Sequence, residues 1–114
     1  MHISEFIKAV QSELSQLNYI QETSIESEVF TARIKVKVKD ALSIYIFYNQ
    51  KTGTLSYALL NQYRRIWGID CNDPVGWHEH TFENPEGHIL IKPKNVYEVI
   101  RKLHTILQII IYDN

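Results

Sequence analysis

The chain has 114 residues, of which 45% are hydrophobic and 22% are charged, as is usual for a single globular domain. The formal net charge of −1 excludes a strong overall basic field, so nucleic-acid binding would have to depend on local patches. The single cysteine, Cys71, excludes a disulfide framework and fits a reducing compartment. Because no apolar run is long enough to span a membrane and residues 1–10 do not resemble a signal peptide, we expect a cytoplasmic protein with no membrane partner.

The first segment predicts a helix that has Ser4 as its N-cap and ends near Asn18. One face of this helix carries an apolar stripe formed by Phe6, Ile7, Val10, Leu14 and Leu17. Residues 19–24 form an ambiguous extended segment. Residues 28–39 predict a strand more clearly, because apolar and basic side chains alternate there with a period of two.

The middle of the chain predicts further strands. Residues 43–48 are dense in isoleucine, tyrosine and phenylalanine and predict a more buried strand, which turn residues 49–53 connect to the next one as a hairpin. Residues 55–67 predict one longer strand with room for a bulge, ending at Gly68. Residues 70–87 have a loop composition around a short extended piece at 77–82.

The last part of the chain predicts a short strand at residues 88–92 and a helix that begins at Asn95, where Asn95 and Glu98 have the spacing of a capping box. Whether residues 109–112 extend this helix or form a terminal strand stays open, because both fit the apolar run. Since amphipathic helices need a surface to cover, we predict a single two-layer α+β domain over residues 1–114. Its antiparallel sheet has four to five strands and is flanked, on one face, by an N-terminal and a C-terminal helix.

A row of basic residues is the first candidate for a functional surface. It consists of Arg33, Lys35, Lys37 and Lys39. Side chains two residues apart on a strand are about 6.6 Å apart on one face, which suits contacts to successive phosphates of a single nucleic-acid strand. The alternative is an ordinary solvated face or a protected edge strand, with Glu26 and Glu28 as counter-charges.

The second candidate combines aromatic and guanidinium groups. In an extended segment Tyr63, Arg65 and Trp67 share a face, whereas Arg64 points the other way. Such a face could stack a base and neutralise a phosphate. The alternative is that Trp67 belongs to the core and that one arginine pairs with a carboxylate.

The third candidate is the group of His78, Glu79 and His80, followed by His88. The two histidines of the extended piece could bind a metal ion together with Asp70, Asp73 or Cys71, but their spacing matches no established zinc signature. Alternatively, they could supply the acid and base for metal-independent RNA cleavage, with Glu79 and the two arginines close in sequence. Loop histidines without a task are the third possibility.

The segment from Tyr63 and Arg64 through Asp70 and Pro74 to the two histidines resembles the TumE-like toxins of prokaryotic toxin–antitoxin pairs. Gly87, Pro93 and the last helix follow in the same order, so the resemblance covers roughly residues 30–105. The chain departs from the family in residues 70–76, where the histidine next to the proline is missing. The resemblance implies a toxin that acts on RNA and is neutralised by an antitoxin protein.

From the residues and this resemblance together, we predict a toxin-like protein that cleaves or binds RNA. The predicted catalytic residues are His78, His80, Arg64, Arg65 and Glu79. The predicted nucleic-acid-binding residues are Arg33, Lys35, Lys37, Lys39, Tyr63 and Trp67. No metal site or cofactor is assigned. The alternatives are a non-catalytic interaction module, acting as a homo-oligomer or with another partner, and, ranked third, a protein that binds metal through its histidines.

Overall fold

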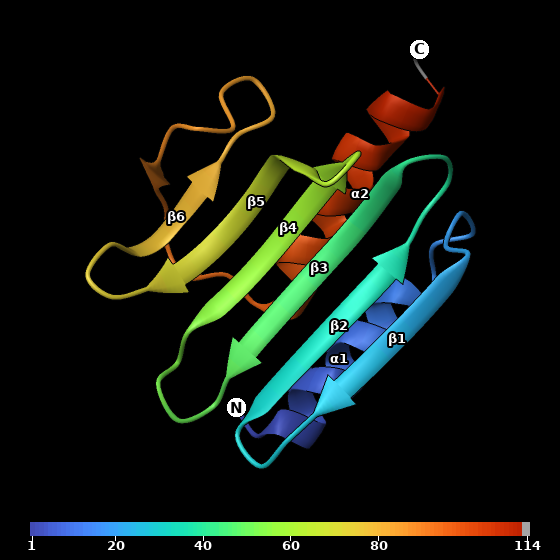
Figure 1. The fold of residues 1–114 in the computed structure, drawn as a ribbon. Helices are drawn as coiled ribbons and strands as arrows, with labels where there is room; N and C mark the ends of the chain where they lie inside the picture. The colour runs from blue at the N-terminus through green and yellow to red at the C-terminus, as the bar shows by residue number, and fades with distance from the viewer. Residues whose placement is uncertain (113–114) are drawn as a thin grey trace.

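The computed structural model describes residues 1–112 as one α+β unit (Figure 1). Its elements, in chain order, are α1 (Ile3–Leu14), β1 (Glu22–Ser27), β2 (Thr31–Lys37), β3 (Leu42–Asn49), β4 (Leu55–Asn61), β5 (Arg64–Asn72), β6 (Gly76–His80), β7 (Ile89–Leu90) and α2 (Val96–Tyr112). The seven strands form one antiparallel sheet in which spatial order follows chain order. No helix within residues 1–112 is long and apolar enough to cross a lipid bilayer.

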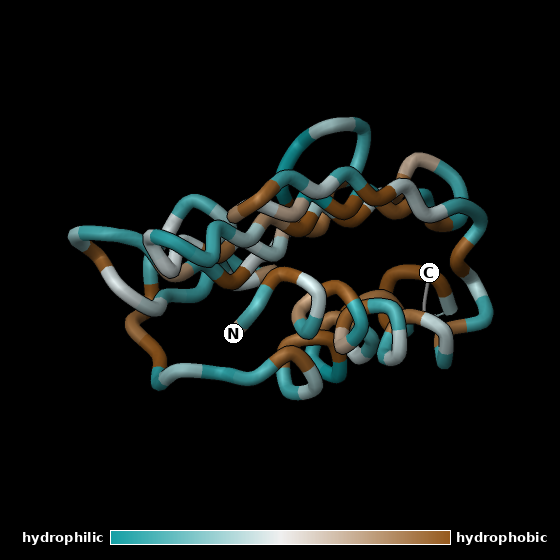
Figure 2. The backbone as a smooth tube through the Cα atoms, turned by 90° about the horizontal axis from the view of Figure 1, so that it is seen from below, coloured by the Kyte–Doolittle hydropathy of each residue, from teal (hydrophilic) through white to brown (hydrophobic). Residues whose placement is uncertain are grey.

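Both helices pack against the same side of the sheet, as Figure 2 shows in an edge-on view. We call this side the inner face and the opposite side, which no helix of the described residues 1–112 covers, the outer face. Along each strand, side chains alternate between the two faces. The predicted two-layer arrangement is therefore confirmed.

The prediction of four to five strands is wrong, because the sheet within residues 1–112 has seven. The ambiguous segment at residues 19–24 overlaps the first half of the edge strand β1, and the predicted long strand at residues 55–67 is two strands, β4 and β5. Gln62 and Tyr63 divide it, because both have positive φ angles, of 50° and 67°, as in a two-residue hairpin turn. The sequence does not indicate this turn, since neither residue is the glycine or asparagine that is typical of it.

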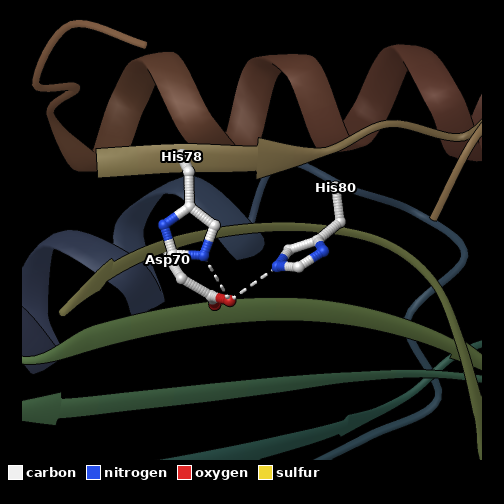
Figure 3. A group of neighbouring side chains, drawn as sticks. All are labelled: Asp70, His78 and His80. Atoms are coloured by element: carbon white, nitrogen blue, oxygen red, sulfur yellow. Dashed lines mark hydrogen bonds and ion pairs between the residues drawn. The ribbon is translucent and has the colours of Figure 1, made fainter. Parts of the chain in front are cut away.

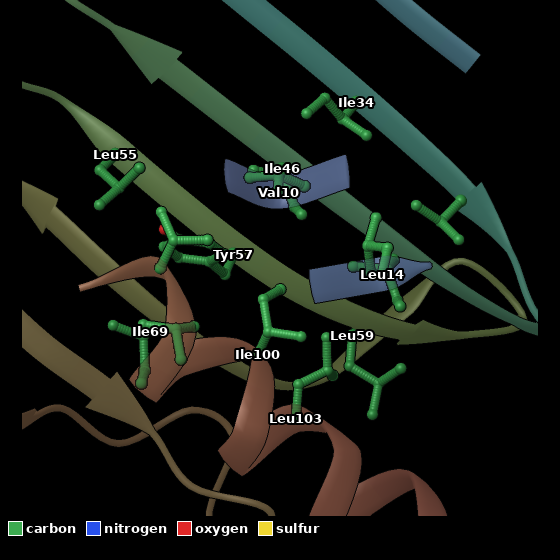
Figure 4. Close-up of a cluster of buried hydrophobic side chains, with 14 of the residues drawn as sticks. Val10, Leu14, Ile34, Ile46, Leu55, Tyr57, Leu59, Ile69, Ile100 and Leu103 are labelled. Atoms are coloured by element: carbon green, nitrogen blue, oxygen red, sulfur yellow. The ribbon is translucent and has the colours of Figure 1, made fainter. Parts of the chain in front are cut away.

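The core lies between the inner face and the two helices (Figure 4). Val10 and Leu14 of α1 and Ile100 and Leu103 of α2 are buried against strand residues such as Ile46. The apolar stripes that predicted the helices are thus the surfaces that the helices bury.

The helix ends differ in part from the predictions. The first helix ends at Leu14 instead of near residue 18, and its N-cap is His2, whose ring accepts a hydrogen bond from the backbone of Ser4. The capping box of the last helix is confirmed: Asn95 and Glu98 exchange side-chain to backbone hydrogen bonds of 2.8 and 3.0 Å. Residues 109–112 extend α2 and do not form a strand.

Candidate metal centre

Three neighbouring strands bring polar side chains together on the outer face. In the sheet register Ser56 of β4 lies opposite Asp70 of β5, and Asp70 lies opposite His78 of β6. His80, two residues further along β6, points from the same face and lies opposite Gly68. Asp70, His78 and His80 converge, and we call them the Asp-His cluster (Figure 3). All three are buried, although they lie on the face without helices.

The carboxylate of Asp70 is held by two side chains. Arg65 donates from Nη2 to Oδ1 (2.7 Å) and from Nη1 to Oδ2 (2.9 Å), and the hydroxyl of Ser56 donates to Oδ1 (2.7 Å). Burial works against the charged carboxylate, but the hydrogen bonds from Arg65 and Ser56 outweigh it and hold the pKa of Asp70 below its usual range. Asp70 is therefore an ionised acceptor with a fixed orientation at neutral pH.

A β-bulge places Arg65 on this face. The pairing of β4 with β5 shifts between Leu59 and Leu60, because Leu59 lies opposite Trp67 whereas Leu60 lies opposite Arg65. Ile66 is the extra residue, and the alternation of faces restarts there. Arg65 consequently reaches Asp70 on the outer face, while Trp67 is fully buried in the core. The prediction that Arg65 and Trp67 share a face is wrong for this reason.

Backbone carbonyls fix both histidines. Nδ1 of His78 lies 2.9 Å from the carbonyl oxygen of Gly76, and Nδ1 of His80 lies 3.0 Å from that of Pro85. Because a carbonyl only accepts, we assign the proton of each neutral ring to Nδ1. Each Nε2 is then a bare acceptor, and both face Oδ2 of Asp70, at 3.6 Å from His78 and 3.1 Å from His80. In a neutral ring the other tautomer would move the conflict to the carbonyl side, and only a ring protonated on both nitrogens could donate to both acceptors.

With both rings in this neutral tautomer, three acceptor atoms face one another at the centre of the cluster. One ligand atom from each of Asp70, His78 and His80 lies within 4.8 Å of the other two. Ligand atoms around a tetrahedral zinc ion are about 3.4 Å apart, close to the 3.1 and 3.6 Å measured from Oδ2 to the two Nε2 atoms. Burial, followed by the positive charge of Arg65, lowers the pKa of His80 and favours its neutral ring. These residues fit a divalent transition-metal ion.

The segment of residues 81–88 folds over the cluster. Pro85 accepts the hydrogen bond from His80, and the ring of His88 stacks on His78, with ring centroids 5.0 Å apart. The same ring meets His80 edge-on, with centroids 4.7 Å apart. A third imidazole thus lies next to the two that face Asp70.

Glu79 lies between the two histidines in sequence but on the opposite face of the sheet. Its carboxylate accepts from Nε1 of Trp67 (2.9 Å) and from Nζ of Lys102 on α2 (2.7 Å). Glu79 is 6% exposed, so these two donors surround a buried charge. The structure therefore gives Glu79 a contact with the helix layer and separates it from the histidines.

Other predicted residues also lie apart from the cluster. Arg64 and Tyr63 are exposed at the β4–β5 turn, and Tyr63 has 95% of its surface accessible. Asp73 is exposed in the turn before β6, and Cys71 is half-buried on the strand that carries Asp70. Ser56 was not predicted, because only the pairing of β4 with β5 places it beside Asp70.

The basic row lies on the outer face, but β3 and β4 separate it from the strand that carries Asp70. Arg33, Lys35 and Lys37 point outward from β2, whereas Lys39 follows the end of the strand. The register also places two glutamates of β1 beside the row: Glu26 lies opposite Arg33, and Glu22 lies opposite Lys37.

Comparison of the chain with protein-family models, with curated protein sequences and with solved structures finds no match. The resemblance to TumE-like toxins, and the roles that it implies, therefore stay predictions. What the chain does has to be inferred from its own geometry.

Proposed function

We propose that this protein binds one divalent transition-metal ion through Asp70, His78 and His80. The observation that carries the proposal is the convergence of three potential ligand atoms, Oδ2 of Asp70 and the two Nε2 atoms, which lie 3.1 and 3.6 Å from Oδ2. When both rings are neutral and carry their protons on Nδ1, an ion between these atoms would replace the repulsion among their lone pairs with coordinate bonds. Two imidazoles and one carboxylate are a ligand set used for zinc and for non-haem iron.

The surroundings of the three residues are those of preorganised ligands. Proteins commonly hold a metal-binding histidine through a hydrogen bond from its other nitrogen, and both Nδ1 atoms make such a bond here. Arg65 and Ser56 orient the carboxylate of Asp70, and Oδ2 keeps a second lone pair for the ion. The positive charge of Arg65 opposes cation binding, so we expect lower affinity than for the same ligands without a neighbouring cation.

The burial of the cluster favours ion binding over the recognition of a large substrate. Asp70, His78 and His80 are 6%, 2% and 9% exposed, and residues 81–88 cover them. A bound ion would connect β5 with β6 and support the covering segment. The proposed role of the ion is thus to stabilise this end of the sheet.

Calorimetric titration of tag-free protein, first treated with a chelator and then dialysed, tests the proposal. We expect one site per chain for Zn²⁺ or Co²⁺, and a visible absorption spectrum for bound Co²⁺ that reports its coordination. His78→Gln and His80→Gln should each weaken binding by more than about tenfold, because each removes one ligand atom.

The matched control is His2→Asn, which removes an imidazole at the start of α1 but retains a side chain that can cap a helix. This variant should bind the ion as the parent protein does. The absence of stoichiometric binding for both ions would contradict the proposal. So would an equal loss of affinity in His2→Asn and His80→Gln.

A second candidate is the RNA cleavage implied by the resemblance to TumE-like toxins. The convergence of Arg65, His78 and His80 around Asp70 supports it, since an imidazole can move a proton at neutral pH and a guanidinium can neutralise a phosphate. Residues 81–88 would have to open to admit RNA. Protein incubated with cellular RNA and EDTA should cleave it, His80→Ala should not, and an antitoxin partner should block the reaction. Intact RNA at high protein excess would contradict this candidate.

A further inference from the structure

A groove of about 440 Å³ lies on the outer face over β1–β4, away from the Asp-His cluster. Its lining includes Glu22, Lys35, Lys37, Tyr45, Leu60 and Tyr63. This volume is within the range of about 300–1,000 Å³ that is usual for small-molecule sites. We propose that the groove binds a nucleotide unit of single-stranded nucleic acid. The inference goes beyond metal binding and holds whether or not the cluster cleaves RNA.

The charge in the groove suits an anionic ligand. Lys35 and Lys37 are exposed on consecutive outward positions of β2, about 6.6 Å apart along the strand. Arg33 occupies the next outward position on the same strand. The cations therefore continue beyond the groove, as binding to successive phosphates of an extended strand requires. This continuation favours a polynucleotide over a free nucleotide.

Aromatic rings lie beside these cations. Nζ of Lys35 lies 5.7 Å from the ring centroid of Tyr45, and the guanidinium of Arg33 lies 5.1 Å from the ring centroid of Phe47. Rings on an uncovered sheet face can stack unpaired bases while neighbouring cations hold the phosphates. The outer face thus offers both kinds of interaction on adjacent strands.

Tyr63 is the most informative residue of the groove. It is 95% exposed and has a φ of 67°, a conformation that glycine or asparagine adopts more easily. Neither core packing nor turn geometry accounts for a tyrosine at this position. A ring at the rim of the groove that stacks on a base would account for it, and backbone strain of this kind is common where a ligand binds.

Glu22 restricts which kinds of ligand the groove can bind. It lines the groove directly across from Lys37, so a ligand that carries only negative charge would be repelled there. A nucleotide also carries donors, namely its sugar hydroxyls and the amino groups of its base, which a carboxylate can accept from. A nucleotide therefore matches the groove better than an inorganic anion or an acidic peptide does.

Fluorescence anisotropy with a labelled single-stranded RNA of mixed sequence tests the inference, at salt concentrations between about 50 and 200 mM. Lys35→Gln should weaken binding by about threefold to tenfold and make the salt dependence less steep, by about 0.7 in the logarithmic slope for each phosphate that the variant no longer neutralises. Tyr63→Gly should weaken binding by at least about fivefold, the lower end of the effect of removing one stacked base. The same variant should unfold at a higher temperature than the parent protein. A purely structural role for Tyr63 would not weaken binding.

The control for charge is Lys8→Gln, which removes one exposed cation from α1 on the other side of the molecule. It should leave the affinity within about twofold of the parent. Three results would overturn the inference: no binding at the lower salt concentration, equal effects of Lys8→Gln and Lys35→Gln, or duplex RNA bound as tightly as the single strand. Metal titration of the same variants should be unchanged, which separates this inference from the proposed metal site.

Discussion

Gly68 controls whether Arg65 can reach Asp70, which makes Gly68→Ala a sharp test of the site. An added Cβ at Gly68 would overlap Nη2 of Arg65 and lie 2.5 Å from its Cζ. The guanidinium lies at the end of a flexible side chain that is 29% exposed, so it can move into solvent. The substitution therefore removes the hydrogen bonds of 2.7 and 2.9 Å to Asp70 without altering either partner.

The expected decrease in the free energy of unfolding follows from the hydrogen bonds that Asp70 loses and retains. Its buried carboxylate retains the bond from Ser56 but loses two charge-assisted hydrogen bonds, which are worth about 2–3 kcal/mol together once solvation of the released guanidinium is included. The loss of unfolded-state entropy on replacing glycine offsets about 0.4–1 kcal/mol of this. The net destabilisation is about 2 kcal/mol, or about 8 °C in Tm for a domain of this length.

Thermal and urea unfolding of a four-member cycle measures this effect. In an Arg65→Ala background there is no guanidinium to displace, so Gly68→Ala should become neutral or stabilising by up to about 1 kcal/mol. The destabilisation caused by Gly68→Ala should thus disappear or reverse in the Arg65→Ala background. An equal cost in both, or a Gly68→Ala variant within about 0.5 kcal/mol of the parent, would refute the reasoning.

Lys102→Met should destabilise the fold by about 1–2 kcal/mol in urea unfolding, because it leaves the buried carboxylate of Glu79 with only an indole donor, and exposure of Lys102 keeps the cost below that of a fully buried pair. The neighbouring variant Arg101→Met should cost less than about 0.5 kcal/mol, and equal costs would contradict this account. Burial raises the pKa of Tyr19 to about 12. The folded state therefore holds this proton more tightly than the unfolded state, and stability should fall as the pH rises from about 10 to 12. Tyr19→Phe should make this fall less steep in unfolding curves measured across that range. Tyr63→Gly should raise the free energy of unfolding by about 1 kcal/mol, since glycine adopts the positive φ without strain; an unchanged or lower value would contradict the strain argument.

Much of the fold could be predicted because its signals are local. Alternation along residues 31–37 and the apolar stripes of the two end segments each report one buried face. The turn at Gln62 and Tyr63 could not be predicted, because its residues lack the usual preference for positive φ. The strand predicted at residues 88–92 is present, but only Ile89 and Leu90 pair with β6.

The candidate site could be predicted only in part. The pair His78 and His80 was visible, because residues two apart on a strand share a face. Asp70 appeared as one of three possible companions, and only the pairing of β5 with β6 selects it. The face of the sheet from which Arg65 points depends on the bulge at Ile66, and no residue type at this position indicates a bulge.

The order of the strands has a consequence for synthesis of the protein. Since each strand pairs with its neighbours in the chain, the sheet can grow hairpin by hairpin as the polypeptide leaves the ribosome. The helix α2, which buries Leu59 and Ile69 in the finished molecule, is translated after all seven strands. A nascent chain halted before residue 96 would therefore expose apolar side chains of the inner face to water. Such a chain should depend on chaperones until α2 packs against the sheet.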